Sequence, residues 1–290
     1  MQKIKKEDFK DLSVKNTIKQ ISSLLKSLPD YTAGEEKKLV CKSLNLSLKD
    51  LVLLKEFSPN QLKILKRVTK KRLMGKPLNK ILKRADFFLD EFYINNHVLA
   101  PRKETEIVVE QVLEVVNSSK NSLEILDLCC GSGAIGLSVL KHAKNKVNLT
   151  LVDKSAKALK IAKKNAKLLK VFDAKFIKSN MFSHLKKHKR FDIIACNPPY
   201  ICSRELSSLQ VGVKNFDPKI ALDGGKDGLK FYKVIAENSQ NFLNSQGVLI
   251  LEIGYNQASD VSNLLAQNKF TSIKVLKDYS GNDRVVIAKF

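Results

Sequence analysis

The chain has 290 residues, 43% of them hydrophobic, which is enough for a core and for one large domain plus a small one. Its 52 Lys and Arg residues exceed its 29 Asp and Glu residues, giving a net charge of +23, and no apolar run is long enough to predict a membrane span. The first residues carry charges without a following apolar segment, so we expect no signal peptide and a cytoplasmic protein. Five cysteines without zinc-ligand spacing favour a reducing compartment and predict no metal site.

Residues 1–74 predict a small helical domain. Apolar residues recur at intervals of three and four over three segments, 7–27, 33–44 and 58–73. Ser58 followed by Pro59 is typical of the N-cap and first position of a helix. Gly75 begins a break in the helical pattern, and residues 75–98 mix aromatic and polar side chains. We expect a hairpin or linker there, followed by a larger domain over residues 99–290.

Positive charge is dense around the start of this linker, where residues 61–85 include ten basic residues and no acidic one. One interpretation is a contact surface for an acidic or RNA-bound partner. The other is a solvated helix face in a Lys-rich protein, because lysines are scattered over the whole chain and aromatic residues do not alternate with them. Direct nucleic-acid binding therefore stays open.

The larger domain reads as alternating strands and helices. Its seven short apolar segments lie at 123–128, 147–153, 174–178, 191–196, 247–253, 271–276 and 284–290. Strands separated by helices predict an α/β fold with a mostly parallel sheet. Because ligands bind beyond the carboxyl ends of such strands, the loops after the first four strands are expected to meet at one edge.

A tight turn of small residues follows the first of these strands, and a helical pattern begins at Ala134. The turn consists of Cys129, Cys130, Gly131, Ser132 and Gly133. A strand, a Gly-rich loop and a helix in this order let the backbone approach a nucleotide-like ligand. The next strand ends in Asp153, where an acid can accept hydrogen bonds from both hydroxyls of a ribose. Capping of the following helix is the alternative role for Asp153.

Residues 197–200 read Asn-Pro-Pro-Tyr, directly after the fourth strand. The side-chain carbonyl of Asn197 and the main-chain carbonyl of Pro198 are two acceptors for a planar NH₂ group. Pro198 and Pro199 fix the backbone direction, and Tyr200 offers a ring face for stacking. An NH₂ nitrogen next to a carbonyl or ring is a poor nucleophile, and two prepositioned acceptors favour the charge it develops during attack. We therefore assign catalysis to Asn197 and Pro198, and substrate binding to the whole tetrapeptide; a simple turn is the alternative.

Together these features resemble the class I S-adenosylmethionine-dependent methyltransferases, although Cys129 replaces the first glycine of their G-x-G-x-G loop. Residues 99–106, Leu-Ala-Pro-Arg-Lys-Glu-Thr-Glu, are similar to the L-I-P-R-P-[DE]-T-E segment of the HemK/PrmC-type protein-(glutamine-N5) methyltransferases. Residues 217–232 and 251–254 match two further patterns of that family. The resemblance spans roughly residues 75–290.

The resemblance implies a Rossmann-like seven-stranded sheet whose last strand is antiparallel, with a small N-terminal helical domain. It implies S-adenosylmethionine as cofactor, S-adenosylhomocysteine as product, and peptide-chain release factors as partners, methylated at the side-chain nitrogen N5 of the glutamine in their Gly-Gly-Gln motif. Because a glutamine side chain needs little surface to enter a site, we expect residues 1–74 to select the protein that carries it.

The resemblance also implies where the cofactor binds. The expected contacts are Cys129, Cys130, Gly131, Ser132, Gly133, Asp153, Asn180, Met181 and Asn197. Asn180 and Met181 stand where relatives often have an acid before the Phe182 position, in a segment that contacts adenine. Arg102 and Thr105 lie at the start of a helix from which they can reach cofactor or substrate, with helix capping as the alternative for Thr105.

Three other functions remain open at this stage. A sister family methylates a glutamine of a ribosomal protein. Asn-Pro-Pro-Tyr also suits the exocyclic amine of adenine, so N6-adenine methylation of DNA or RNA is a second alternative, favoured by the charge and opposed by the lack of a recognisable base-reading domain. A non-catalytic binding module is the third, and the intact tetrapeptide opposes it. The modified release factor can be free or on the ribosome.

Overall fold

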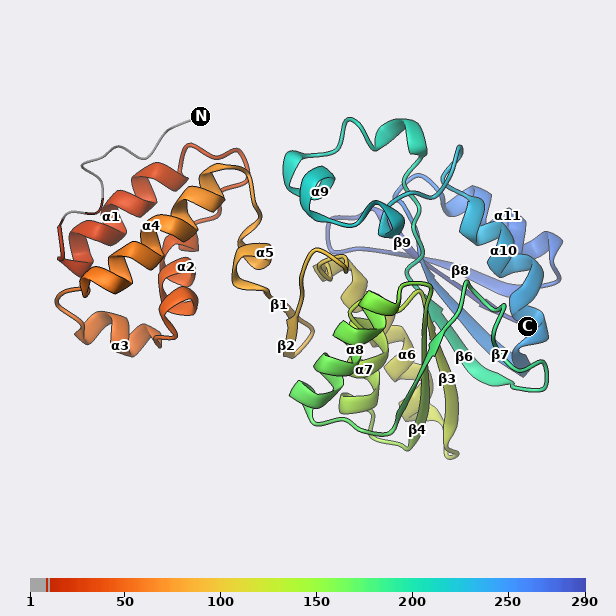
Figure 1. The fold of residues 1–290 in the computed structure, drawn as a ribbon. Helices are drawn as coiled ribbons and strands as arrows, with labels where there is room; N and C mark the ends of the chain where they lie inside the picture. The colour runs from red at the N-terminus through yellow and green to blue at the C-terminus, as the bar shows by residue number, and fades with distance from the viewer. Residues whose placement is uncertain (1–8, 10) are drawn as a thin grey trace. The chain divides into compact units, whose positions relative to one another are not determined.

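The computed structural model describes residue 9 and residues 11–290. These residues form two compact units, and Figure 1 colours the ribbon by residue number so that each can be followed. Unit 1 consists of the described residues up to Lys83 and of residues 210–216, and unit 2 of residues 84–209 and 217–290. The break before residue 84 lies inside the segment where we expected a hairpin or linker. No helix in the described part of the chain combines the length and the apolar character needed to cross a bilayer.

Unit 1 is helical, as its sequence predicts. Its helices are α1 (Val14–Leu25), α2 (Glu35–Leu44), α3 (Leu48–Leu53), α4 (Pro59–Leu73), α5 (Leu78–Leu82) and α9 (Val211–Phe216). The helices expected over 33–44 and 58–73 are confirmed. Of the first expected helix, α1 forms residues 14–25, while positions 7, 8 and 10 lie outside the described residues.

Two capping boxes mark helix starts in unit 1. Ser58 caps α4 as predicted, and Gln61 completes the box by accepting from the N–H of Ser58. The unpredicted helix α3 begins with the same device, because Ser47 and Asp50 each accept the backbone N–H of the other. Reciprocal capping satisfies two N–H groups that a helix start otherwise leaves unpaired. This signal explains how a helix of only six residues forms at α3.

The helices of unit 1 enclose an apolar core that contains a buried ion pair between α2 and α4. Ile21, Leu39 and Leu65 are completely buried in it. The Arg72 guanidinium on α4 donates to the Glu35 carboxylate at the start of α2 with an N–O distance of 2.5 Å. A buried charge is tolerated when its partner is this close, and removal of Arg72 leaves the buried Glu35 carboxylate without this partner. The pair therefore specifies how α2 and α4 pack.

Unit 2 is an α/β domain preceded by a hairpin. The hairpin pairs β1 (Arg84–Phe87) with β2 (Asp90–Tyr93) in antiparallel register. The helices are α6 (Glu106–Ser118), α7 (Ala134–His142), α8 (Ala156–Leu169), α10 (Lys230–Asn238) and α11 (Ala258–Gln267). The strands are β3 (Leu123–Leu128), β4 (Val147–Asp153), β5 (Ala174–Lys178), β6 (Phe191–Cys196), β7 (Leu243–Glu252), β8 (Thr271–Lys277) and β9 (Asp283–Lys289).

The seven strands form one sheet in the order β5-β4-β3-β6-β7-β9-β8. All neighbours are parallel except β9, which runs antiparallel to both β7 and β8, so the expected antiparallel last strand is confirmed. Strand β7 begins at Leu243, earlier than the predicted start at residue 247. Leu243 pairs with Phe191, and an irregularity in the pairing then shifts the register before Val248 pairs with Ile193.

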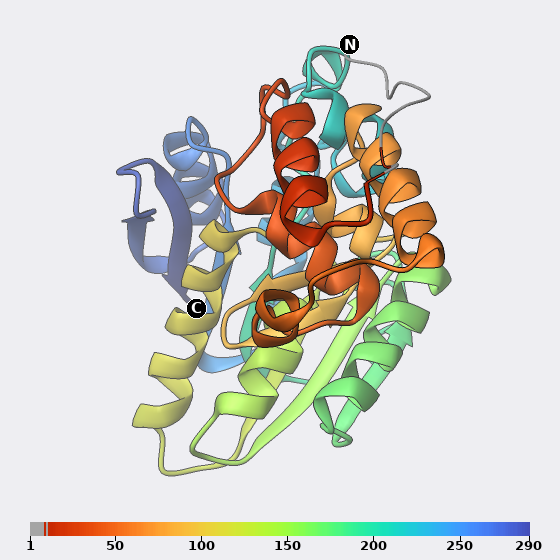
Figure 2. The same ribbon diagram turned by 90° about the vertical axis from the view of Figure 1, so that its left-hand side faces the viewer.

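Helices cover both faces of the sheet (Figures 1 and 2). One face packs against α6, α7 and α8 through alternate strand residues such as Ile125 and Ile193. The opposite face packs against α10 and α11 through their neighbours, such as Leu126 and Ile194. Strands buried on both faces read as continuous apolar runs, and this is why the strand bounds could be predicted well.

The sheet register brings the functional loops together. Leu128 at the end of β3 pairs with Val152 in β4 on one side and with Cys196 at the end of β6 on the other. The chain therefore leaves these three strands at the same level of the sheet. This geometry places the Gly-rich loop, the acid at the end of β4 and the Asn-Pro-Pro-Tyr segment at one edge.

Candidate active site

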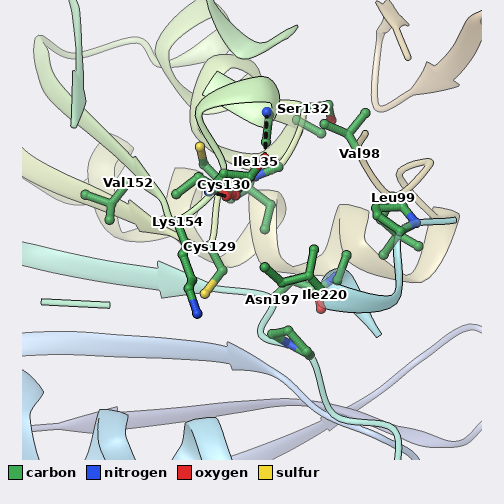
Figure 3. A pocket seen from close by; sticks show the side chains of 18 of the residues that line it. Val98, Leu99, Cys129, Cys130, Ser132, Ile135, Val152, Lys154, Asn197 and Ile220 are labelled. Atoms are coloured by element: carbon green, nitrogen blue, oxygen red, sulfur yellow. Dashed lines mark hydrogen bonds between the residues drawn. The ribbon is translucent and has the colours of Figure 1, made fainter. Parts of the chain in front are cut away.

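A cavity with about 960 Å³ of empty volume, its solvent-filled mouth included, opens at this edge of unit 2 (Figure 3). Most of the predicted site residues line it: Thr105, Cys129, Cys130, Gly131, Ser132, Asp153, Asn180, Met181, Asn197 and Pro199. The structure thus brings together residues from five separate segments of the sequence.

Four predicted site residues do not line the cavity wall. Arg102 is exposed, and Gly133 is the N-cap of α7 behind the loop. Pro198 is buried, and Tyr200 is half-buried with its hydroxyl bonded to another side chain. The roles proposed for these residues therefore depend on their main-chain groups, their charge or their contacts with residues that do line the cavity.

The loop after β3 is shaped by left-handed backbone. Cys129, Gly131 and Gly133 have φ angles of 62°, 54° and 79°. Because side chains strain this conformation, Cys129 carries a cost that the glycine of relatives would avoid. No atom lies within 4 Å of the position that a Cβ on Gly131 would take, so bare backbone faces open space there. A ligand can approach this part of the loop closely.

Asp153 fastens this loop to the end of β4. Its Oδ2 accepts the N–H of Gly131 at 2.9 Å, and its Oδ1 accepts the N–H of Ser155 at 2.7 Å. Ser155, not Asp153, is the N-cap of α8, with its hydroxyl accepting from Ala158. Burial raises the pKa of Asp153, while the two N–H groups lower it. A carboxylate has about four acceptor positions, so Asp153 keeps capacity for further hydrogen bonds toward the cavity.

Two buried polar residues that sequence reasoning missed also hold the loop. Asp127 accepts the N–H of Gly136 in α7, and burial raises its pKa to about 7. Asn165 on α8 donates to the carbonyls of Ser132 and Tyr93 and accepts the Tyr93 N–H. Asn165 thereby ties the Gly-rich loop to the end of the β2 hairpin strand. A polar residue on an otherwise apolar helix face is the only sequence signal it gives.

The segment after β5 is a tight turn built around Ser179. The Ser179 hydroxyl donates to the carbonyl of Met181 at 2.7 Å and accepts the N–H of His184 at 2.9 Å. Met181 is buried with a left-handed φ of 52°, and its sulfur lies 3.6 Å from the Sγ of Cys129. Asn180 is exposed beside the cavity. The turn thus contributes one apolar side chain, Met181, and one polar side chain, Asn180, to the lining of the cavity.

Asn197 is connected to a buried hydrogen-bond network. Its Nδ2 donates to the Oγ1 of Thr105 at 3.3 Å, and the Thr105 hydroxyl donates to the Oε2 of Glu252 at 2.6 Å. Thr105 is the N-cap residue of α6, but its side chain makes no capping bond, so the alternative role does not account for its hydroxyl. Glu252, at the end of β7, also accepts from the hydroxyl of Tyr200. Sequence reasoning saw Glu252 only as part of a family pattern.

Two further segments complete the cavity wall. His97, Val98, Leu99 and Pro101 precede α6, and Pro218, Ile220 and Ala221 lie between α9 and α10. Both segments overlap stretches in which the sequence resembles a known family, and this was the available signal. No cluster of His, Cys, Asp or Glu suited to a metal ion occurs among residues 9 and 11–290.

A seven-stranded sheet of this order, with a Gly-rich loop, an acid after the second strand and Asn-Pro-Pro-Tyr after the fourth, defines a class I S-adenosylmethionine-dependent methyltransferase. The family model "Methyltransferase small domain" matches residues 103–212. The chain belongs to the release factor glutamine methyltransferase family, as its curated relatives show. A solved structure of the hMettl16 catalytic domain has the same fold, with a TM-score of 0.57, 16% identity and coverage of 77% of this chain and 82% of that one.

Two relatives named release factor glutamine methyltransferase illustrate the family match. The protein from Thermodesulfovibrio yellowstonii is 40% identical over 235 residues, which are 80% of this chain and 83% of that protein. The protein from Fusobacterium nucleatum subsp. nucleatum is 43% identical over 214 residues. This match covers 74% of this chain but only 60% of the longer Fusobacterium protein.

The residues around the cavity fit S-adenosylmethionine. Asp153 presents a carboxylate for ribose hydroxyls, and the open face of Gly131 leaves room for close approach of the cofactor. Val98, Val152 and Ile220 supply apolar surface suited to a flat base. The Asn197 side chain, which carries one carbonyl acceptor, lines the same cavity and lies beside Ile220 (Figure 3). The cavity therefore offers the polar and apolar contacts that the cofactor needs.

Proposed function

We propose that this protein transfers a methyl group from S-adenosylmethionine to the side-chain nitrogen N5 of the glutamine in the Gly-Gly-Gln motif of peptide-chain release factors. The observation that carries the proposal is the position of Asn197, whose carboxamide lines the same cavity as Asp153 and the Gly-rich loop. The names of the curated relatives support the same substrate. We propose a cytoplasmic location with this function, because release factors act in translation.

The chemistry follows from an amide clamp, which we define as Asn197 to Tyr200. When bound, S-adenosylmethionine supplies a methyl group on a sulfonium, which is a good leaving group. The Asn197 Oδ1 and the Pro198 carbonyl each accept one hydrogen of the glutamine NH₂ and thereby hold the nitrogen in place. As the nitrogen becomes positive, both acceptors stabilise it, and it then loses a proton to water. Positioning and prearranged dipoles supply the catalysis.

Tyr200 contributes through its ring and its protonated hydroxyl. Burial and the nearby Glu252 carboxylate raise the pKa of Tyr200 to about 12, so the phenol keeps its proton at neutral pH. The phenol donates a hydrogen bond to Glu252, which fixes the ring at the end of the clamp. A fixed ring face is suited to stacking on a planar amide.

We further propose that unit 1 binds the release factor. Helix α3 exposes three large apolar side chains, Leu48, Val52 and Leu53, with 63%, 84% and 70% of their surface accessible. Lys15, Lys37 and Lys55 lie around the groove that adjoins this helix. Apolar residues inside a basic rim suit an acidic protein surface with an apolar anchor. Contacts of this kind involve parts of the release factor other than the reacting amide, so they raise the rate only on the whole protein substrate.

The proposed function is tested by methyl transfer with labelled S-adenosylmethionine. Release factor, release factor whose Gly-Gly-Gln glutamine is replaced by Ala, ribosomal protein, tRNA and DNA are compared in parallel. We expect label on the intact release factor alone, and none on the replaced one. Preferential labelling of ribosomal protein, tRNA or DNA would refute the proposed substrate, and parallel reactions with isolated release factor and with ribosome complexes would show in which state it is modified.

A further inference from the structure

We propose that Thr105 and Glu252 are positioning residues that decide which end of the Asn197 carboxamide faces the cavity. The inference rests on the proposed function, because it concerns the acceptor that holds the substrate NH₂ group. It begins with a chain of three side chains from three distant parts of unit 2. Asn197 donates through Nδ2 to Thr105 at 3.3 Å, and Thr105 donates to Glu252 at 2.6 Å.

The direction of these hydrogen bonds follows from counting protons. A threonine hydroxyl has one proton, and an ionised carboxylate can only accept. With its proton directed at Glu252, the Thr105 oxygen can only accept in turn. It therefore pairs with the NH₂ end of Asn197, because the carbonyl end would place two acceptors against each other. The Asn197 Oδ1 is thereby left for the cavity, as the clamp requires.

Glu252 is held firmly enough to impose this direction. Its side chain is 1% exposed, and its second oxygen accepts from the hydroxyl of Tyr200 at 3.3 Å. Its main-chain carbonyl accepts from the hydroxyl of Tyr232 in α10 at 2.9 Å. One carboxylate therefore orients both ends of the amide clamp, Asn197 through Thr105 and Tyr200 directly.

The charge of Glu252 is set by opposing influences. Burial raises the pKa of Glu252, while hydrogen bonds from Thr105 and Tyr200 and the positive charges of Arg284 in β9 and Arg102 before α6 lower it. Tyr232 also lies against Glu252, and burial raises the pKa of its phenol well above the usual value. A protonated Glu252 could donate to Thr105, and Thr105 could then donate to the wrong end of Asn197. Turnover is therefore expected to fall on the acid side as Glu252 gains its proton.

The decisive experiment compares Thr105→Val, which keeps the shape but removes the hydroxyl, with Thr105→Ser, which keeps the hydroxyl. Thr150→Val, at a buried threonine in β4, serves as the matched control. We expect Thr105→Val to lower kcat about tenfold, the equivalent of one hydrogen bond, without changing the Kd for S-adenosylmethionine. Thr105→Ser and Thr150→Val should retain most of the turnover. Thermal melting confirms that each variant folds.

A double-mutant cycle separates positioning from general damage. If Thr105 acts through Asn197, Thr105→Val should add almost nothing to the loss caused by Asn197→Ala. In Glu252→Gln, which has no proton to gain, the acid-side fall in kcat should disappear. Wild-type turnover in Thr105→Val, or an undiminished further loss in the Asn197→Ala background, would overturn the inference.

A readout without turnover keeps the inference testable if the proposed substrate is wrong. The side-chain NH₂ signals of Asn197 in a ¹⁵N-labelled protein report whether its hydrogens are bonded. We expect Thr105→Val to shift these signals and to speed their exchange with water, and Thr105→Ser to leave them near their wild-type positions. Unchanged signals in Thr105→Val would refute the positioning role. A wild-type protein that labels no release factor refutes only the proposed substrate.

Discussion

The two halves of the candidate active site are held by different kinds of contact. In the cofactor half, Asp153 accepts the backbone N–H groups of Gly131 and Ser155. Ser155 is two residues away in sequence, and Gly131 lies in the loop after β3, the strand that pairs with β4. In the amide half, Asn197 depends on the side chain of Thr105, which lies 92 residues away in sequence. Through Thr105 it also depends on the side chain of Glu252. The backbone N–H groups that Asp153 binds persist when the side chains around them change, whereas the side-chain network of Asn197, Thr105 and Glu252 fails when any one member is replaced. The cofactor half should therefore tolerate substitutions that the amide half does not.

The largest effect is expected from Asn197→Ala in the amide half. Removal of one prearranged dipole costs about two to three orders of magnitude in turnover, so kcat should fall at least 100-fold. The Kd for S-adenosylmethionine, measured by calorimetry, should change much less. Equal losses in cofactor binding and turnover would show that the two halves do not act separately. Turnover like that of the wild type would refute the role of Asn197 in the amide clamp.

The next effect is expected from Asp153→Ala in the cofactor half. If Asp153 accepts from ribose hydroxyls, the loss of hydrogen bonds to a charged group should weaken cofactor binding by about 1.5–3 kcal/mol. Asp153→Asn keeps an acceptor for the N–H of Ser155 and should lose less. Calorimetry gives both values, and an unchanged Kd in Asp153→Ala would limit Asp153 to holding the loop.

A smaller effect is expected in unit 1 from Val52→Asp. A charge on the exposed apolar face of α3 should lower kcat/KM on whole release factor about tenfold, the equivalent of about 1.4 kcal/mol of docking energy. Transfer to a short glutamine peptide should not change, because the peptide lacks the part of the release factor that would bind α3. Phe172→Asp is the control, since Phe172 in unit 2 is also exposed, at 75%. Equal losses from both variants, or equal losses on peptide and protein, would exclude α3 as the docking surface.

The smallest effect is expected from Cys129→Gly. Glycine relieves the strain of a φ of 62°, but it gains entropy in the unfolded chain and loses the contact between Cys129 and the sulfur of Met181. These effects oppose each other, so unfolding in urea should show a stability change within about 1 kcal/mol. Cofactor affinity should change less than threefold. A large loss of affinity would show that cofactor binding depends on the Cys129 side chain.

Local sequence patterns determined most of the fold. Four strands, at 123–128, 147–153, 174–178 and 191–196, have the bounds that their apolar runs predicted. Apolar runs predict buried strands reliably because both faces of this sheet are covered. The start of β7 at Leu243 was missed because it depends on pairing with Phe191 and on a shift of register. Helix α3 was missed because its six residues are too few for a periodic pattern.

The sequence also placed the residues of the cofactor half. Neighbouring parallel strands that end at the same edge of a sheet bring the loops after them together, and this does not depend on the side chains of the loops. The sequence named Asn197 and Thr105 as well, but as separate candidates. Only the tertiary structure connected them and added Glu252, 147 residues from Thr105. A hydrogen bond between such distant residues leaves no periodicity or spacing in the chain. Its direction depends on which group holds the proton, and that is decided where the three side chains meet.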